Sequence, residues 1–230
     1  MTTPHNPLTT DFRGDLATLG RYESLVEKFL ATEMAALNSR VEAGSAAYAP
    51  EDRQDYFEAA HLDDFMELSQ ELPTILRHSI LTAANSALEQ YLNETCRAHA
   101  EVTKTRLDVA DLAGTGLRQA QVYLKKVGGM VFPDHDESWV AVQRLRELRN
   151  SIVHGDGYVH ESNAPLISWL QKCRGVKIPA SHFVTLEAPF VGEALTWYER
   201  FAEVFDEACE PLSLWFSVFP PLPVEDEKSP

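Results

Sequence analysis

The broadest apolar stripe in the sequence lies in residues 73–99, and it constrains the fold more than any other feature. Pro73 suits the first turn of a helix, and apolar side chains then recur every three or four positions. These side chains are Leu76, Ile80, Ala83, Ala84, Ala87, Leu88, Tyr91 and Leu92. A stripe this wide is typical of a helix that other helices cover on several sides. We therefore expect a helical bundle built around this segment.

Helical periodicity dominates the rest of the chain as well. We predict further helices in residues 16–43, 51–72, 106–127, 139–154, 164–173 and 189–216. Two β-branched runs flank Pro179, Ala180 and Ser181, and they predict one small β-hairpin near residues 176–186. The sequence thus predicts an all-α fold with one hairpin. Its expected parts are a disordered N-terminus (1–15), an N-terminal helical extension (16–70), a helical bundle (72–218) and a disordered tail (219–230).

Charge and cysteine content narrow the possible functions. A net charge of -15 argues against a broad basic surface for nucleic acid, so any contact with nucleic acid should be local. Three scattered cysteines lack metal-ligand spacing, and we expect reduced thiols and no metal or other cofactor. The first 15 residues have no basic or apolar region of a signal peptide, and no apolar run is long enough for a membrane span. We therefore expect a cytoplasmic protein.

Residues 145–160, LRELRNSIVHGDGYVH, hold the strongest candidate for a site. Asn150 and His154 are four residues apart, so they share a helix face, and the long side chain of Arg149 should reach the same place. A histidine near a helix C-terminus is stabilised in its charged form by the helix dipole, which suits it to acid-base chemistry. The other interpretation is ordinary helix termination, with Gly155 as the residue after the helix and the basic side chains compensating the dipole.

The segment LRNSIVHG resembles the signature of the HEPN superfamily, an arginine, a polar residue and a histidine at the end of a bundle helix. Here Arg149 and His154 are separated by four residues, and Asn150 is the polar residue. RHSILTAANSALEQYLNETC is similar to the first core helix of standalone bacterial HEPN domains, with Glu89 among apolar residues. The resemblance covers roughly residues 72–218 and implies a HEPN-like helical bundle.

The resemblance also implies an activity and partners. Active HEPN proteins are homodimeric, metal-independent endoribonucleases, many of them toxins or phage-defence effectors. On this basis Arg149, Asn150 and His154 would be catalytic, and Glu89 would support Arg149. RNA would be the substrate, and an antitoxin or nucleotidyltransferase would be a possible partner protein. The alternative that the family offers is a catalytically inactive interaction or regulatory module.

A local basic strip would compensate for the acidic total in binding RNA. Its candidate members are Lys104, Arg106, Arg118, Lys125, Lys126, Arg144 and Arg146. Each of these side chains is also compatible with an ordinary solvated position on a helix.

Overall fold

The computed structural model describes residues 6–114 and 116–209 of the chain. Its elements in chain order are α1 (Pro7–Ser45), η1 (Pro50–Asp52), α2 (Arg53–Ala60), α3 (Leu62–Met66), η2 (Glu67–Glu71), α4 (Leu72–Thr103), η3 (Val109–Asp111), α5 (Leu117–Lys126), α6 (Glu137–Gly155), α7 (Ala164–Leu170), β1 (Val176–Lys177), β2 (Thr185–Leu186) and α8 (Ala188–Cys209). The predicted all-α fold with one small hairpin is confirmed. In the hairpin, Val176 pairs with Leu186 and Lys177 with Thr185 in antiparallel register.

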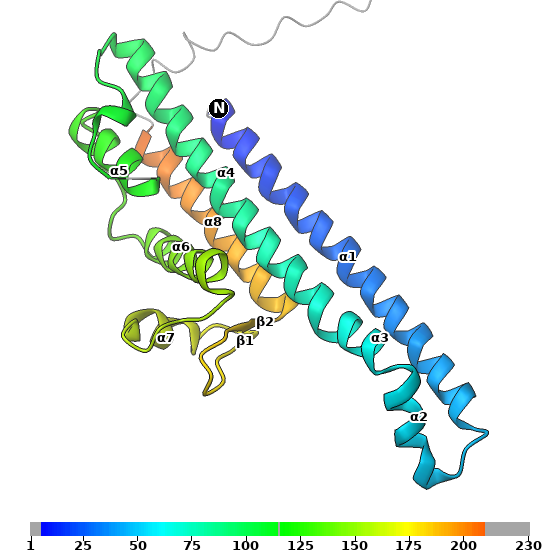
Figure 1. Cartoon of the computed structure of the whole chain (residues 1–230). Helices are drawn as coiled ribbons and strands as arrows, with labels where there is room; N and C mark the ends of the chain where they lie inside the picture. The colour runs from blue at the N-terminus through cyan, green and yellow to red at the C-terminus, as the bar shows by residue number, and fades with distance from the viewer. Residues whose placement is uncertain (1–5, 115, 210–230) are drawn as a thin grey trace, which may run out of the picture.

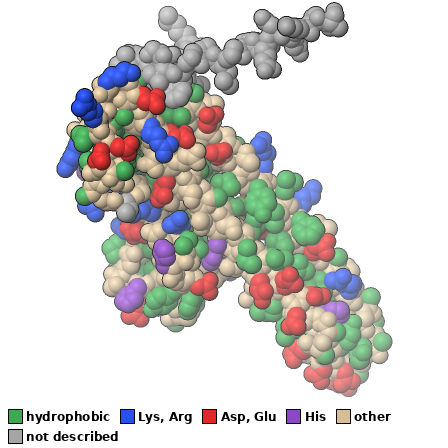
Figure 2. Space-filling model, turned by 45° about the horizontal axis from the view of Figure 1, so that its top comes forward, with side chains coloured by type: hydrophobic (Ala, Val, Ile, Leu, Met, Phe, Trp, Pro, Cys, Tyr) green, Lys and Arg blue, Asp and Glu red, His purple; other side chains and the backbone are tan. Residues whose placement is uncertain are grey.

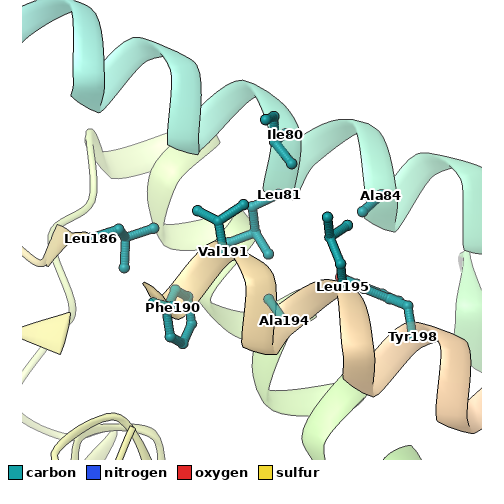
Figure 3. A pocket seen from close by; sticks show the side chains of 9 residues that line it. All are labelled: Ile80, Leu81, Ala84, Leu186, Phe190, Val191, Ala194, Leu195 and Tyr198. Carbon is teal, nitrogen blue, oxygen red and sulfur yellow. The ribbon is translucent and has the colours of Figure 1, made fainter. Parts of the chain in front are cut away.

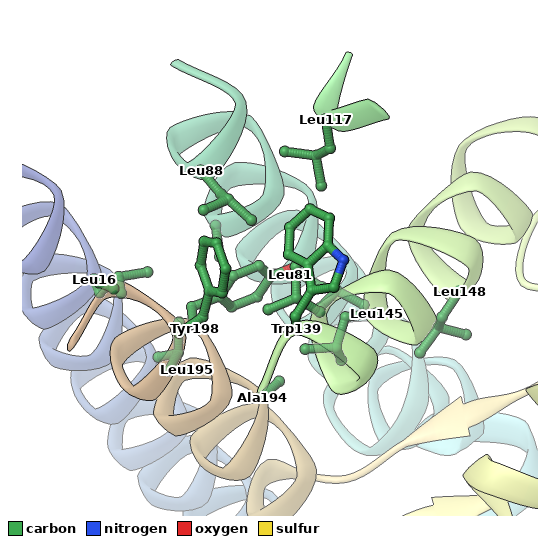
Figure 4. Packing of buried hydrophobic residues seen from close by; sticks show 14 of the residues in the cluster. Leu16, Leu81, Leu88, Leu117, Trp139, Leu145, Leu148, Ala194, Leu195 and Tyr198 are labelled. Atoms are coloured by element: carbon green, nitrogen blue, oxygen red, sulfur yellow. The ribbon is translucent and has the colours of Figure 1, made fainter. Parts of the chain in front are cut away.

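Three long helices, α1, α4 and α8, lie side by side and form the spine of the molecule (Figure 1). α4 runs antiparallel to α1, and α8 returns alongside both. α6 packs on α4 and α8, with α1 on their other side, while α5 covers the end of α4 (Figure 4). α6, which carries the candidate motif, is therefore held by two helices of the spine.

The core contains the apolar stripe of α4, as the sequence predicts. Leu76, Ile80, Leu88 and Leu92 are buried there and belong to one continuous hydrophobic cluster. Figure 4 shows how side chains from α1, α4, α6 and α8 meet, with Leu16, Leu88, Trp139, Leu145 and Tyr198 among those that converge. Burying a large apolar side chain stabilises a fold by roughly 1.5–3 kcal/mol, so this cluster fixes the four helices relative to one another.

The α4–α8 contact is tight and dry. Ile80, Leu81 and Ala84 of α4 face Val191, Ala194 and Leu195 of α8 across an apolar seam (Figure 3). The seam has no room for a water molecule. It is therefore a packing surface of the bundle and no binding pocket.

The start of α1 differs from the prediction of disorder over residues 1–15. The helix begins at Pro7, where the Asn6 side chain accepts a hydrogen bond from the Leu8 amide at 3.0 Å. Phe12 is buried and stacks on Tyr91, and Thr9 bonds both Tyr91 and Asp206. These contacts with α4 and α8 order residues 7–15, so the prediction is wrong for that part; residues 1–5 lie outside the described range.

The predicted helix over residues 51–72 is interrupted. His61 has a non-helical φ of -139°, which ends α2 and starts α3 in a new direction. From Leu62 the chain continues through a π-helical stretch, Glu67–Glu71, directly into α4. No residue of α2, α3 or η2 is buried, and Figure 1 shows these elements projecting beyond the bundle.

The boundary predicted between residues 16–70 and 72–218 does not follow the packing. Leu16 and Leu30 of α1 belong to the same hydrophobic cluster as α4 and α8. The elements η1, α2, α3 and η2 project together with the end of α1, whereas the first part of α1 belongs to the bundle and is no separate extension. The predicted tail, 219–230, lies outside the described residues, as does the end of the predicted helix over 189–216.

Candidate functional site

The motif lies on the last turns of α6 (Figure 1). The helix begins at Glu137, two residues before the predicted start, and the Asp136 side chain accepts a hydrogen bond from the Ser138 amide at 2.8 Å. Its end differs from the prediction, because Gly155 is still helical and Asp156 is the left-handed residue, with φ of 51°. Gly157 follows with φ of 84° and turns the chain toward the hairpin. His154 is thus in the last helical turn.

Arg149 and Asn150 are joined by a hydrogen bond in which His154 takes no part. Nη1 of Arg149 donates to Oδ1 of Asn150 at 3.2 Å, and both side chains are partly buried. His154 is exposed, and no hydrogen bond joins it to Arg149 among the described residues. Positions five apart on a helix are separated by roughly 140° around its axis. The structure therefore joins Arg149 and Asn150 by a hydrogen bond and puts Arg149 and His154 on different sides of the helix.

Arg149 reaches toward a small set of polar side chains between α4, α6 and α8, which we call the inner polar group: Asn85, Glu89, Arg149 and Tyr198. Asn85 donates to Oε1 of Glu89 at 3.3 Å. Tyr198 is completely buried, and burial raises the pKa of its phenol, while the nearby Arg149 cation lowers it and Glu89 raises it further. The phenol thus stays protonated beside two opposite charges.

Three atoms of the inner polar group have no hydrogen-bond partner within the described chain. They are Oδ1 of Asn85, Nε of Arg149 and the hydroxyl of Tyr198. Buried polar atoms usually have partners, since leaving one unpaired costs about 1–3 kcal/mol. Their presence in one group is typical of a site that is not designed for stability alone.

Glu89 occupies a space shaped by Gly116. This glycine has φ of 57°, and a Cβ on it would lie 2.8 Å from Oε1 of Glu89. The positive φ favours glycine at this position, whereas the Glu89 carboxylate is the end of a flexible side chain and can shift away from a Cβ. The predicted support of Arg149 by Glu89 is not a direct ion pair in the described residues, because Glu89 bonds Asn85 instead.

His154 lies in a different environment, which we call the α6 outer end: Val153, His154, Tyr158 and Phe183. All four side chains are exposed. The Tyr158 and Phe183 rings are 5.5 Å apart, and the two residues form an isolated antiparallel bridge. Three large apolar side chains are therefore exposed to solvent near the end of α6.

His78 of α4 connects the spine to the turn after α6. Burial lowers the pKa of His78, and the carboxylate of Asp156 acts in the opposite direction. A Cβ on Gly157 would lie 3.7 Å from Cε1 of His78, so the ring packs directly beneath the turn. The amide of Val184 bonds the carbonyl of Gly157 at 3.0 Å and fixes the hairpin to the same turn. These contacts position the α6 outer end.

Sequence reasoning missed two residues of the inner polar group. Tyr198 lies in the predicted helix over 189–216 and is buried, but the sequence gives no sign that its phenol lies near Arg149. Asn85 is a polar residue inside the apolar stripe of α4, four positions before Glu89, and this placement was a usable signal.

The described residues contain no cluster of three or more histidine, cysteine or acidic side chains that could hold a metal ion. In the loop before α6, Asp136 caps the helix, and Asp134 bonds Gln121 and Lys125. Cys96, Cys173 and Cys209 are free thiols, as expected. No helix within the described ranges is long and apolar enough to cross a membrane.

Charge is distributed unevenly along the molecule. Residues 50–71 contain eight acidic residues and one arginine, whereas residues 97–126 contain six Lys or Arg and three acidic residues. Figure 2 shows Lys and Arg side chains gathered over the end that carries α5, and Asp and Glu over the projecting end. Of the predicted basic strip, Lys125 pairs with Asp134 and Arg144 with Glu147 at 2.9 Å, so two members are partly neutralised.

Comparison with known proteins gives no assignment: no family model, no curated protein and no solved structure matches this chain.

Proposed function

We propose that this protein is a metal-independent endoribonuclease of the HEPN type that acts as a toxin or phage-defence effector. The observation that carries the proposal is the end of α6, where Arg149 is bonded to Asn150 next to an exposed His154. A fixed cation and a free imidazole on one helix end are the groups that RNA cleavage requires.

In the proposed reaction the ribose 2′-hydroxyl attacks the adjacent phosphorus. The new bond joins the 2′-oxygen to phosphorus, and the bond from phosphorus to the 5′-oxygen breaks. His154 takes the proton of the 2′-hydroxyl or delivers one to the leaving 5′-oxygen. Arg149 stabilises the negative charge on the phosphoryl oxygens, and Asn150 orients the guanidinium. Because the nucleophile belongs to the substrate, no metal-bound water is required, and the products end in 2′,3′-cyclic phosphates.

The inner polar group would keep Arg149 in place. Arg149 and Glu89 both lie close enough to act on the Tyr198 phenol, and Asn85 donates a hydrogen bond to the Glu89 carboxylate. Gly116 leaves space for that carboxylate, so the group is a set of positioning residues and not part of the reaction itself.

Dimerisation is part of the proposal. Val153, next to His154 in the chain, and the Tyr158–Phe183 pair beyond the helix end are exposed, and pairing two copies over the α6 outer end would cover them. Such a pair would also bring two motifs to one cleft, where Arg149 of one copy could act with His154 of the other, since no hydrogen bond joins the two residues within one described chain.

The basic residues near α5 would hold the RNA strand. An antitoxin or nucleotidyltransferase is the proposed partner protein, and the cytoplasm the proposed location.

A catalytically inactive interaction module is the second candidate. It is favoured by the lack of a hydrogen bond between Arg149 and His154 among the described residues. It is also favoured by the exposed Tyr158–Phe183 pair, which suits a binding surface for protein. The module would bind a partner over the α6 outer end and leave RNA intact.

A cleavage assay with a chelator present separates the two candidates. The parent protein should cut single-stranded RNA but not the same sequence with 2′-deoxyribose, because the attacking hydroxyl is then missing. Arg149→Lys should be almost inactive, since an ammonium group lacks the planar fork that holds a phosphate. Arg53→Lys is the matched control and should cleave at the parent rate, because Arg53 is exposed, begins α2 and is not a member of the basic strip. Intact RNA with the purified parent would favour the interaction module.

A further inference from the structure

The exposed side of α1 carries a long uncharged stripe. Its members are Thr18, Tyr22, Leu25, Phe29, Thr32, Ala36 and Ser39. All seven are exposed, and they follow one another at alternating intervals of four and three residues. The large members are 52% (Tyr22), 68% (Leu25) and 58% (Phe29) exposed. We call this set the α1 stripe.

The α1 stripe is not needed to hold α1 in the bundle. The opposite side of the helix buries Leu16, Leu30 and Leu37 and packs on α4 and α8. Figure 2 shows hydrophobic side chains along the edge of the molecule that α1 forms. Large apolar side chains gathered on the surface of a folded protein are typical of an interaction site.

The spacing defines what kind of partner fits. Alternating steps of four and three are the heptad pattern by which one helix receives another, with Tyr22 and Phe29 at one core position and Leu25 at the other. The stripe keeps this pattern for three heptads, about 32 Å at 1.5 Å per residue. A partner of irregular structure does not require such a pattern, whereas a helix does.

The charges beside the stripe point to a second copy of the same helix. Lys28 lies on one flank and Glu33 on the other, five residues later, and neither has an ion-pair partner within the described ranges. In a parallel pair, each flanking residue faces the one five positions later in the other helix. Lys28 would then face Glu33 of the second copy, and the symmetry makes this contact twice. An antiparallel pair that packs Leu25 on Phe29 would instead bring the two Lys28 side chains together.

We propose that α1 pairs in parallel with α1 of a second copy through the α1 stripe. This surface is distinct from the α6 outer end, so the inference does not depend on the proposed ribonuclease activity. The competing occupant is the segment 210–230 of the same chain, because α8 ends at Cys209 near the start of α1, where Asp206 bonds Thr9.

Sedimentation equilibrium of the full chain over a concentration series tests the pairing. Phe29→Glu should halve the average mass relative to the parent, while Val131→Glu should leave it unchanged because Val131 is 84% exposed but lies off the stripe. Lys28→Glu alone and Glu33→Lys alone should each weaken association roughly tenfold, and the double exchange should restore it. A parent with the mass of one chain, or no effect of Phe29→Glu, overturns the proposal. Stronger association after removal of residues 210–230 overturns it as well, since the tail would then be the occupant.

Crosslinking tests the orientation. Thr18→Cys in a Cys173→Ser background should form a disulfide between two copies, because a parallel pair places the two residues opposite each other; the remaining thiols, Cys96 and Cys209, are buried. In an antiparallel pair they would be separated by nearly the whole stripe. In the contradicting outcome, Thr18→Cys fails to crosslink while Phe29→Glu still reduces the mass. That result would indicate an antiparallel pair and overturn the proposal of a parallel one.

Discussion

The inner polar group and the α6 outer end both include residues from the last turns of α6. The first is packed inside the bundle, and the second is exposed to solvent. Nε of Arg149 is buried and the Arg149 cation acts on the fully buried Tyr198, whereas His154, five residues later, is exposed to solvent. Side chains inside the bundle should contribute to both stability and activity. Side chains on the outer end should contribute to activity or association alone, so the two regions can be separated by experiment.

The largest expected difference concerns the two tyrosines. Tyr198→Ala should lower the free energy of unfolding by about 3–5 kcal/mol, because it leaves a cavity in the core. Tyr158→Ala should lower it by less than about 1 kcal/mol, since this ring is partly in solvent. Urea denaturation measures both. Tyr198→Phe is the control and should be close to the parent, because its hydroxyl has no partner in the described chain. Equal losses for Tyr158→Ala and Tyr198→Ala would remove the distinction between the regions.

Gly116 tests how closely the inner polar group is fitted. Gly116→Ala should cost about 1–2 kcal/mol of unfolding free energy, since the positive φ is strained for alanine and the new Cβ meets Glu89. The matched control is Gly14→Ala in α1, where a Cβ meets nothing within 4 Å. That change should stabilise the protein by roughly 0.5–1 kcal/mol, because alanine favours a helix. If thermal unfolding shifts both variants in the same direction, the Glu89 space is not restrictive.

Substitutions at Arg149 and His154 should differ in how much they lower the free energy of unfolding. Arg149→Met should cost about 1 kcal/mol, because it leaves Glu89 and Asn150 without their cationic neighbour. His154→Ala should change stability by less than about 0.5 kcal/mol, as is usual for exposed positions. Chemical denaturation of the two variants beside the parent decides this, and a larger loss for His154→Ala would contradict the assignment of inside and outside.

The smallest expected effect is a pH dependence through His78. Burial lowers the pKa of this ring from its ordinary value of 6.5, so the unfolded chain binds more protons in the window below that value. The free energy of unfolding should therefore fall as the pH drops from about 7 through this window. Burial lowers the pKa of His99 as well, in the same direction. His78→Gln should make the dependence shallower, and His78→Gln with His99→Gln shallower still. An unchanged slope in the double variant would show that other groups govern it.

Parts of this fold were predictable because they depend on neighbours in sequence. The α4 stripe, the Asp136 cap and the hairpin near Pro179 are local patterns, and all three are present. The order of residues 7–15 depends on contacts from Thr9 to Tyr91 and Asp206, which are far away in the sequence. Such contacts leave no periodic signal.

The candidate site shows the same limit. The sequence correctly places Asn150 and His154 on one helix. The angle between Arg149 and His154 around the helix axis follows from their spacing of five residues, and it was underestimated from the sequence. The inner polar group combines three helices, and Tyr198 carries no sequence signal for its contact with Arg149. Its membership follows from the packing of α8 on α6.

The most direct test of the central claim is RNA cleavage by His154→Ala beside the parent, under single-turnover conditions with a chelator. His154 is exposed, so its replacement leaves the fold unchanged, and circular dichroism of the same samples verifies this. The account predicts 2′,3′-cyclic phosphate ends from the parent and a loss of at least about a hundredfold in rate for the variant, the usual contribution of one acid-base group. Cleavage by His154→Ala at the parent rate would contradict the account.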